Sequence, residues 1–269
     1  AKCRLFTPAF TGQAVVCADD PWGRRLLATL ESRGELDLHP YALADAGEVE
    51  LGPAGASFRW RGERVELALT GRFNEANAVG AATTAAVLGL EPAVIAAGLS
   101  TAAPVPGRFE TVAAGQPYTV IVDYSHKPDA LEQALRAARE LVSHDGRLTV
   151  VFGCGGDRDA AKRPVMGEVA VRLADQVVLT SDNPRSEDPL AIIDAVHAGM
   201  PASSPVEIDP DRGRAIRSAV NQAGPGDVVL IAGKGHETSQ VIGDHTIPFD
   251  DRAVARAAIE RALATKGPC

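Results

Sequence analysis

The sequence predicts an α/β protein of two domains, the second of which is a doubly wound sheet. From about residue 107 onward, apolar strand patterns alternate with helical patterns in repeated strand–loop–helix units. The expected strands are almost continuously apolar, as in a parallel sheet covered on both faces. A chain of 269 residues is also long for one domain. We place the boundary in the proline-rich segment 102–107, with domains at 1–105 and 106–269.

The first domain is predicted to mix strands and helices. Gly34 is expected to end the first helix, and Gly62-Glu63 to form the two-residue turn of a hairpin. An alanine-rich segment predicts a well-buried second helix. The expected strands or alternating runs are 14–17, 36–41, 57–61 and 64–69, and the expected helices are 22–32 and 78–88.

The second domain is predicted to be more regular. Its first helix begins at Pro128 and has Leu131, Leu135 and Val142 on one apolar face. The next helix ends at Leu173. The expected strands are 118–122, 148–152, 177–179, 206–208 and 228–232, followed by a small pair at 240–242 and 245–247, and the later helices are 190–198, 213–223 and 252–264.

Ligands of open α/β sheets bind in the loops that follow the carboxyl ends of the strands. Four loops should therefore converge: 123–127, 153–159, 181–187 and 233–237. In the third of them, Arg185 can grip a carboxylate, while Asp182 and Asn183 can accept hydrogen bonds from an amine. One loop that recognises both groups suits an amino acid. The alternative is a strand-to-helix turn in which Asp and Asn cap the backbone.

Charged residues in two other loops also suggest ligand contacts. Arg158, Lys162 and Arg163 lie at the start of a helix, where cations oppose the helix dipole, which favours an anion nearby over a solvated face. Glu237 is placed to hold an ammonium group, with a surface carboxylate as the alternative. The segment around Lys234 lacks the spacing of a phosphate loop. His126 and His236 are candidate ligand contacts or structural histidines.

Composition excludes some partners. The net charge of −8 and the lack of a basic tail argue against nucleic acid. No apolar run approaches the roughly 18 residues of a membrane span. The spacing of the four cysteines fits neither a zinc site nor a disulfide framework, so we expect reduced thiols in a cytoplasmic protein.

The loops together resemble the Mur ligase family. The resemblance is carried by Asp123–Leu131, Gly155–Asp159, Asp182-Asn183-Pro184-Arg185 and Gly233–Glu237, with Gly71–Asn77 and Pro106–Glu110 upstream. Within the family they look like the member that adds the third peptide residue to UDP-N-acetylmuramoyl-L-alanyl-D-glutamate. The resemblance implies a Rossmann-like C-terminal domain after part of an ATP-binding central domain. It also implies a ligase that uses ATP and Mg²⁺ and forms an acyl phosphate. We expect the protein to be a monomer.

The resemblance also implies roles for individual residues. The Asp-Asn-Pro-Arg loop marks the meso-diaminopimelate form, whose second carboxylate Arg185 would pair with. An Ala-Lys pair opening a Leu-Phe segment implies that Lys2 is carbamylated and supports magnesium, with a solvent lysine as the alternative. The implied contacts to meso-diaminopimelate are Arg158, Asp182, Asn183, Arg185, Gly233 and Glu237, and those to ATP are Asn74, Asn77, Arg108, Asp123 and His126.

The chain departs from the family pattern in two respects. Ser125 and Lys127 replace the Ala and Thr expected there, and we expect both to be tolerated at the mouth of a cleft. The N-terminal nucleotide-sugar domain, the phosphate loop and the catalytic glutamate are absent, so the chain looks like part of a longer protein. Two rivals remain: a folylpolyglutamate synthase, and a non-catalytic module that binds an amino acid or a nucleotide.

Overall fold

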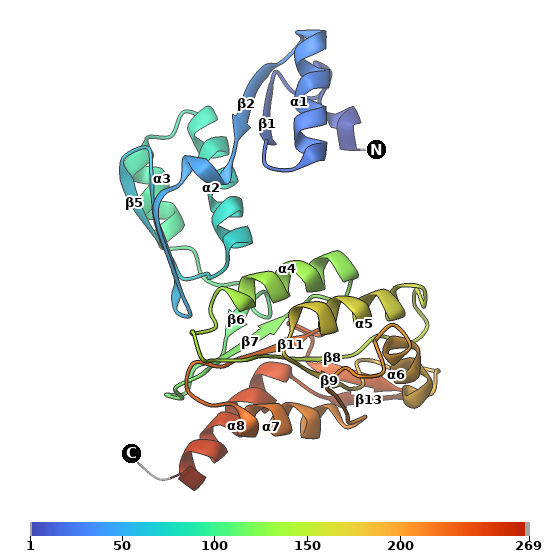
Figure 1. The fold of residues 1–269 in the computed structure, drawn as a ribbon. Coiled ribbons are helices and arrows are strands. Elements are labelled where there is room, and N and C mark those ends of the chain that lie inside the picture. The colour runs from blue at the N-terminus through green and yellow to red at the C-terminus, as the bar shows by residue number, and fades with distance from the viewer. Residues whose placement is uncertain (1, 267–269) are drawn as a thin grey trace. The chain divides into compact units, whose positions relative to one another are not determined.

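The computed structural model describes residues 2–266, except the side chains of Lys2 and Lys266. The chain divides between Ala103 and Pro104 into two compact units. The sequence places the domain boundary two residues later. Figure 1 shows the fold of each unit.

The first unit contains two small sheets. β1 and β2 form a parallel pair in which Val15 lies opposite His39, and β3, β4 and β5 form an antiparallel sheet. Asp20 caps α1, because its Oδ1 accepts hydrogen bonds from the N–H groups of Trp22 (2.8 Å) and Gly23 (2.9 Å). The elements are η1 (Lys2–Leu5), β1 (Gln13–Cys17), α1 (Pro21–Arg33), β2 (Asp37–Tyr41), η2 (Leu43–Asp45), β3 (Gly47–Gly52), β4 (Gly55–Trp60), β5 (Glu63–Leu67), α2 (Arg72–Val87) and α3 (Pro92–Ser100).

Two predictions for this unit are wrong in detail. The hairpin turn is Arg61-Gly62, because Trp60 pairs with Glu63 and both turn residues have positive φ (47° and 88°). Helix α2 begins at Arg72, six residues before the predicted start. β3 and α3 were not predicted from the sequence. Gly34 does end α1, in the left-handed conformation expected of a helix-terminating glycine (φ 62°).

The second unit is a six-stranded sheet with the order β10-β9-β8-β11-β7-β6. All neighbouring strands are parallel except the short edge strand β6, which runs antiparallel to β7. The predicted doubly wound α/β class is thus confirmed. The elements are β6 (Glu110–Thr111), β7 (Thr119–Asp123), α4 (Pro128–Arg139), β8 (Leu148–Phe152), α5 (Lys162–Leu173), β9 (Gln176–Leu179), α6 (Pro189–His197), β10 (Val206–Ile208), α7 (Arg212–Gln222), β11 (Val228–Ala232), β12 (Ser239–Ile242), β13 (His245–Pro248) and α8 (Asp251–Lys266).

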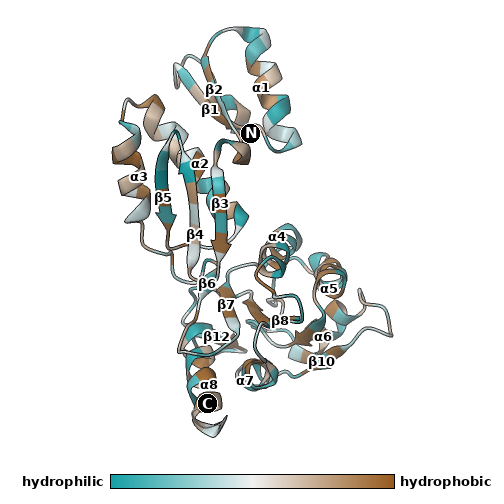
Figure 2. Ribbon diagram, turned by 60° about the vertical axis from the view of Figure 1, so that its left-hand side comes forward, coloured by the Kyte–Doolittle hydropathy of each residue, from teal (hydrophilic) through white to brown (hydrophobic). Residues whose placement is uncertain are grey.

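Helices cover both faces of this sheet. Figure 1 shows α4 and α5 on one face and α7 and α8 on the other. Every residue of β7, β8 and β11 is buried, which explains why these strands are almost continuously apolar. The strands form an apolar band in Figure 2. On the α7–α8 face, side chains such as Val122 and Ile231 pack against Ile216 and Ile259. The carboxyl ends of the strands are therefore held rigidly in one row.

None of the described helices combines the length and the apolar character needed to span a membrane.

Candidate functional site

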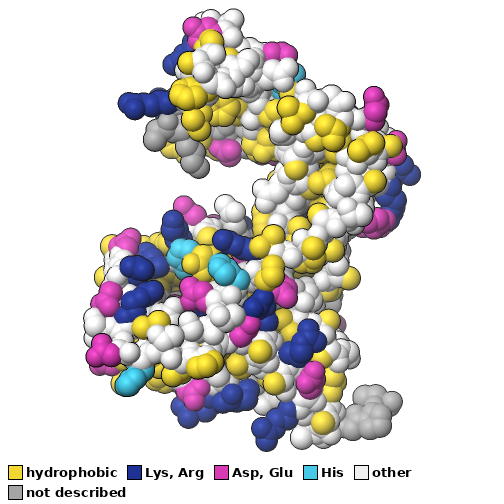
Figure 3. Space-filling view, turned by 180° about the vertical axis from the view of Figure 1, so that it is seen from behind, with side chains coloured by type: hydrophobic (Ala, Val, Ile, Leu, Met, Phe, Trp, Pro, Cys, Tyr) yellow, Lys and Arg dark blue, Asp and Glu magenta, His cyan; other side chains and the backbone are white. Residues whose placement is uncertain are grey.

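A cavity of about 680 Å³ lies at the carboxyl edge of the six-stranded sheet. Its lining comes from all four loops expected to converge there, so that expectation is confirmed. Figure 3 shows basic, acidic and histidine side chains gathered on one side of the second unit. The cavity is lined by the cations Lys127, Arg158, Lys162 and Arg185, by the carboxylates of Asp129, Asp159, Asp182 and Glu237, and by Tyr124, His126, Pro128, Gly155, Asn183 and Gly233.

Glycines allow two of these loops to pack closely. A Cβ at Gly153 would lie 2.1 Å from the carbonyl oxygen of Thr180, and one at Gly156 would lie 1.9 Å from that of Pro184. Both distances are far below contact distance, so any larger residue would separate the loops after β8 and β9. The N–H of Gly156 donates to the carbonyl oxygen of Asn183 at 2.9 Å. The glycines thus place the loop of Arg158 against the loop of Arg185.

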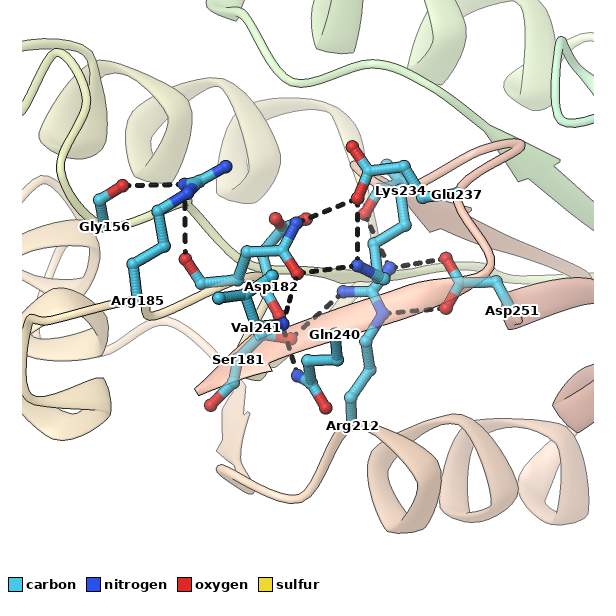
Figure 4. Close-up of polar contacts among 12 residues, drawn as sticks. Gly156, Ser181, Asp182, Arg185, Arg212, Lys234, Glu237, Gln240, Val241 and Asp251 are labelled. Atoms are coloured by element: carbon cyan, nitrogen blue, oxygen red, sulfur yellow. Dashed lines mark hydrogen bonds and ion pairs between the residues drawn. The ribbon is translucent and has the colours of Figure 1, made fainter. Parts of the chain in front are cut away.

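The hairpin of β12 and β13 holds the loop after β9 by hydrogen bonds (Figure 4). Gln240 Nε2 donates to the carbonyl oxygen of Asp182 at 2.7 Å, and the N–H of Val241 donates to Asn183 Oδ1 at 3.0 Å. The N–H of Arg185 donates to the carbonyl oxygen of Val241 at 3.1 Å. These bonds keep Arg185 at a φ of 53°, which is unusual for a residue other than glycine.

The guanidinium group of Arg185 is held by hydrogen bonds through one of its nitrogens only. Its Nη1 donates to the carbonyl oxygens of Gly156 at 2.7 Å and Asn183 at 3.5 Å. Among the described residues, Nε and Nη2 have no hydrogen-bond partner. The free side of the guanidinium is therefore available to a carboxylate in the cavity.

Asn183, Lys234 and Glu237 form one hydrogen-bonded group. Figure 4 labels Lys234 and Glu237 in it. Asn183 Oδ1 accepts from Lys234 Nζ at 3.0 Å, in addition to the bond from Val241. Asn183 Nδ2 donates to Glu237 Oε2 at 2.8 Å, and Lys234 Nζ donates to the same oxygen at 3.0 Å. The amide oxygen, which the sequence analysis assigned to an incoming amine, is thus already used within the protein. Asn183 can act on a ligand through Nδ2.

Asp182 is the buried acid of the site. Burial raises the pKa of its carboxyl group, against the opposing attraction of Arg212 and Lys234. Its Oδ2 has no hydrogen-bond partner among the described residues and lies 2.7 Å from where a Cβ at Gly233 would be. Gly233 (φ 119°) therefore leaves room beside this oxygen. A polar atom buried without a partner is costly, which favours a ligand donor there.

Arg212 and Asp251 form a fully buried ion pair beneath these loops. Arg212 Nε and Nη2 donate to the two oxygens of Asp251 at 2.8 and 2.7 Å. Nη1 and Nη2 also donate to the carbonyl oxygens of Ser181 at 3.3 Å and Ala232 at 3.1 Å. One side chain from α7 thus joins the ends of β9 and β11 to the start of α8.

The three predicted cations have separate roles, and Arg158 lies in the loop four residues before α5, not on the helix as predicted. Arg163 is buried and pairs with Glu187 at 2.8 Å, so an internal carboxylate accounts for it. Lys162 Nζ donates to the carbonyl oxygen of His126 at 2.5 Å. Arg158 and Lys162 both line the cavity, whereas Arg163 does not. The predicted anion contact can therefore involve only the first two.

The ATP-contact candidates are divided between the two units. Asn74 and Asn77 lie one turn apart on α2, where Asn74 Nδ2 donates to the carbonyl oxygen of Thr70 at 2.9 Å. In the second unit, Asp123 Oδ2 accepts from the N–H of Phe109 at 2.8 Å, and its Oδ1 accepts from the Ser125 hydroxyl. Asp123 therefore supports the local backbone. Ser125 is buried and lies inside the fold, not at a cleft mouth as the sequence analysis expected.

Arg108 and His126 surround an aromatic ring. The guanidinium of Arg108 lies 4.8 Å from the centroid of the Tyr124 ring. The rings of His126 and His236 lie 4.6 and 4.9 Å from the same ring. This cationic and aromatic surface suits a nucleotide, because bases stack on such groups and phosphates attract the cation.

Lys2 is in η1, but its side chain lies outside the described part of the structure. Within the described residues, no three His, Cys, Asp or Glu side chains are grouped so that they could hold a metal ion. The magnesium assignment thus has no support from a protein carboxylate cluster in this part of the chain.

Sequence reasoning missed the residues that support the site. The sequence assigns no role to Lys234, Arg212, Gln240 or Asp251 in this site. Lys234 stands beside a predicted ligand residue in the segment Gly233–Glu237, which was a usable signal. Arg212 and Asp251 are 39 residues apart, and no local pattern connects them.

Comparison with known proteins identifies the family. Residues 107–235 match the glutamate ligase domain of Mur ligases. The UDP-N-acetylmuramoyl-L-alanyl-D-glutamate–2,6-diaminopimelate ligase of Streptomyces avermitilis is 46% identical over 279 aligned positions, which cover 97% of this chain and 54% of that protein. The Geobacillus kaustophilus enzyme of the same name is 51% identical over 220 positions, covering 80% of this chain and 45% of that protein.

Solved structures agree with this assignment. A ligase structure with the same name has a TM-score of 0.65 at 34% identity, and the match covers 99% of this chain and 56% of that one. A Mycobacterium tuberculosis folylpolyglutamate synthase has a TM-score of 0.62 at 19% identity, covering 100% of this chain and 59% of that one, which shows the shared fold alone. The chain spans about half the length of the curated relatives it matches. On these findings, the chain belongs to the Mur ligase family.

Proposed function

We propose that the chain forms the amino-acid-binding part of an ATP-dependent ligase. The whole protein would join meso-diaminopimelate to UDP-N-acetylmuramoyl-L-alanyl-D-glutamate in peptidoglycan synthesis. The observation that carries this proposal is the cavity at the carboxyl edge of the sheet, which is lined by four cations and four carboxylates. Such a mixture suits a zwitterionic ligand better than it suits a polyanion.

The proposed pose places the distal amino-acid centre of meso-diaminopimelate in this cavity. Its carboxylate would pair with the free side of Arg185, with Arg158 beside it. Its ammonium group would meet Glu237 and the buried oxygen of Asp182, with Gly233 leaving the space. Lysine has no second carboxylate, so it would leave Arg185 unmatched.

The proposed reaction transfers a phosphoryl group from ATP to the glutamate side chain of the nucleotide substrate. The other amine of meso-diaminopimelate then attacks this acyl phosphate and phosphate leaves. The described residues serve this step by holding the amino acid in place, which turns the attack into an effectively unimolecular process. Mg²⁺ would supply stabilisation of phosphate charge.

The nucleotide assignments stay predictions. Arg108 and His126, which lie beside the ring of Tyr124, are the ATP contacts for which the geometry offers most support, whereas Asp123 would act through the backbone of Phe109. Asn74 and Asn77 are assigned by resemblance. A carbamate on Lys2 also stays a prediction; carbon-13 carbon dioxide should give a carbamate signal in the whole protein that Lys2→Ala removes. The assignment of residues 1–105 and 106–269 to central and C-terminal domains, the monomeric state and the cytoplasmic location are likewise predictions.

A folylpolyglutamate synthase is the weaker alternative. The solved structures of that activity share only the fold with this chain. The loop Asp182–Arg185 resembles that of the meso-diaminopimelate ligases, and a curated relative of that name is 46% identical over 97% of this chain.

Binding of meso-diaminopimelate to residues 1–269 is the first test. We expect calorimetry to show weak binding, because the cavity lies wholly within the second unit. L-Lysine should bind more weakly by at least about tenfold, since a charged hydrogen-bonded pair contributes about 1.5–3 kcal/mol. ATP hydrolysis should be undetectable, because the chain has no phosphate-loop sequence. Equal affinity for the two amino acids would contradict the assignment.

A further inference from the structure

Lys234 is a fully buried cation directly beneath the proposed amino-acid site. It lies in the loop after β11, its side chain is 0% exposed, and it does not line the cavity. Burying an ammonium group without partners costs several kcal/mol, so such a lysine needs a compensating role. Its Nζ donates to Asn183 Oδ1 and Glu237 Oε2, both at 3.0 Å. Both of those residues do line the cavity.

Lys234 fixes the orientation of the Asn183 amide. Oδ1 receives two donors, Lys234 Nζ and the N–H of Val241, each at 3.0 Å. An amide turned by 180° would place its NH₂ group against both donors, so only the observed orientation is allowed. Nδ2 must then point to Glu237, to which it donates at 2.8 Å.

Lys234 also controls the charge of Glu237. Burial alone would raise the pKa of the Glu237 carboxyl group, but hydrogen bonds from Lys234 and Asn183 bring the pKa below its usual value. Arg185 favours the carboxylate further, and the other charged groups that interact with Glu237 are Asp182 and Arg212. Both bonds reach Oε2. Oε1 is therefore the oxygen left for a ligand.

We propose that Lys234 is a positioning residue for the amino-acid substrate. Its ammonium group orients Asn183 and keeps Glu237 as a carboxylate with Oε1 directed to the ligand ammonium. This inference rests on the proposed function, because it takes the ammonium of an incoming amino acid as the group that Glu237 receives. Lys234 itself touches no substrate.

The test is the kinetics of Lys234→Met in the full-length enzyme. We expect KM for meso-diaminopimelate to rise roughly 10- to 100-fold, the effect of losing hydrogen bonds to charged groups. KM for ATP should stay within about twofold, because Lys234 contacts neither Arg108 nor His126. Methionine has similar volume, so the packing should be kept.

The pH dependence separates positioning from a purely structural role. Without Lys234, burial remains and the pKa of Glu237 rises, so protonation removes the carboxylate at higher pH than in the unmodified enzyme. The acid limb of kcat/KM for meso-diaminopimelate should therefore move to higher pH. The deficit of the variant should be larger at about pH 6 than at about pH 8.

Two further variants keep the result interpretable. Arg139→Met breaks an ion pair with Asp175 (2.7 Å) at the opposite edge of the sheet and should leave both KM values and the acid limb unchanged. If Lys234→Met folds poorly, the double variant Lys234→Met/Glu237→Gln removes both charges together and is compared with Glu237→Gln alone. The two variants should have similar KM values for meso-diaminopimelate, because Lys234 acts through Glu237.

The outcomes distinguish this inference from the proposed function. An unmodified enzyme that does not use meso-diaminopimelate contradicts the proposed function, and this inference with it. If the unmodified enzyme is active, an unchanged KM and acid limb in Lys234→Met would overturn the role of Lys234 alone. A double variant whose KM for meso-diaminopimelate is far above that of Glu237→Gln alone would overturn it as well.

Discussion

Arg185→Ala in the full-length enzyme should lower kcat/KM for meso-diaminopimelate by roughly 30- to 1,000-fold, equivalent to about 2–4 kcal/mol. The loss is large because the guanidinium is anchored before any ligand binds. Its Nη1 is held by the carbonyl oxygens of Gly156 and Asn183, and its backbone by β12. The substrate carboxylate therefore binds to a guanidinium group that is already correctly oriented. Truncation would leave that carboxylate without its partner.

The matched variants are Arg185→Lys and Arg217→Ala. Lysine keeps the positive charge but cannot form two parallel hydrogen bonds to a carboxylate. The decrease in kcat/KM for Arg185→Lys should therefore be smaller than that for Arg185→Ala. Arg217 is an exposed arginine of α7 away from the cavity lining, and its removal should leave meso-diaminopimelate kinetics unchanged. KM for ATP should not change in any of the three. If Arg185→Ala keeps kcat/KM within about threefold of the unmodified enzyme, Arg185 does not bind the second carboxylate.

Arg212→Met should lower the free energy of unfolding of the second unit by about 3–5 kcal/mol, because it leaves the buried Asp251 carboxylate unpaired. Both side chains of this pair are 0% exposed. The same change removes the donors to the carbonyl oxygens of Ser181 and Ala232, at the ends of β9 and β11. The loops that hold Asp182 and Lys234 would lose their common support.

Urea denaturation of residues 1–269 can measure this effect with an internal control. Both tryptophans, Trp22 and Trp60, lie in the first unit, so their fluorescence follows that unit alone. The circular dichroism follows both units. The midpoint of the second unit should fall while the tryptophan transition stays in place.

A neighbouring arginine and a double variant complete the comparison. Arg214→Met on the same helix removes a pair with Asp209 whose arginine side chain is 65% exposed, and it should cost at most about 1 kcal/mol. Arg212→Met/Asp251→Leu should recover part of the loss, since no charge is left buried without a partner. Equal effects of Arg212→Met and Arg214→Met would contradict the proposed role of the buried pair.

The doubly wound unit was predictable because the sequence patterns of its strands and helices agree with their places in the fold. Its central strands β7, β8 and β11 are mostly apolar, and every residue in them is buried. β3 and α3, which were not predicted, lack a clear apolar pattern. Four of the six residues of β3 are exposed, so it has no alternating pattern, and α3 is nine residues of small and apolar types between turns. These short elements depend on tertiary contacts more than on local pattern.

The residues that line the site were also more predictable than those that support it. Asp182, Asn183, Arg185 and Glu237 lie in loops that the topology alone brings to one edge. Their partners cannot be read from spacing. Lys234 bonds to a residue 51 positions away, and the direction of the Asn183 amide depends on a strand that follows much later. The sequence therefore indicated which residues face the ligand. It did not indicate the hydrogen bonds that orient those residues.

The most direct test of the proposed function is a competition between amino acids in the full-length enzyme. The enzyme would receive ATP, UDP-N-acetylmuramoyl-L-alanyl-D-glutamate and equal concentrations of meso-diaminopimelate and L-lysine, and mass spectrometry would quantify the products. We expect the meso-diaminopimelate product to exceed the lysine product by at least about tenfold, because lysine leaves Arg185 unpaired. Comparable amounts of the two products, or a dominant lysine product, would contradict the assignment of the cavity.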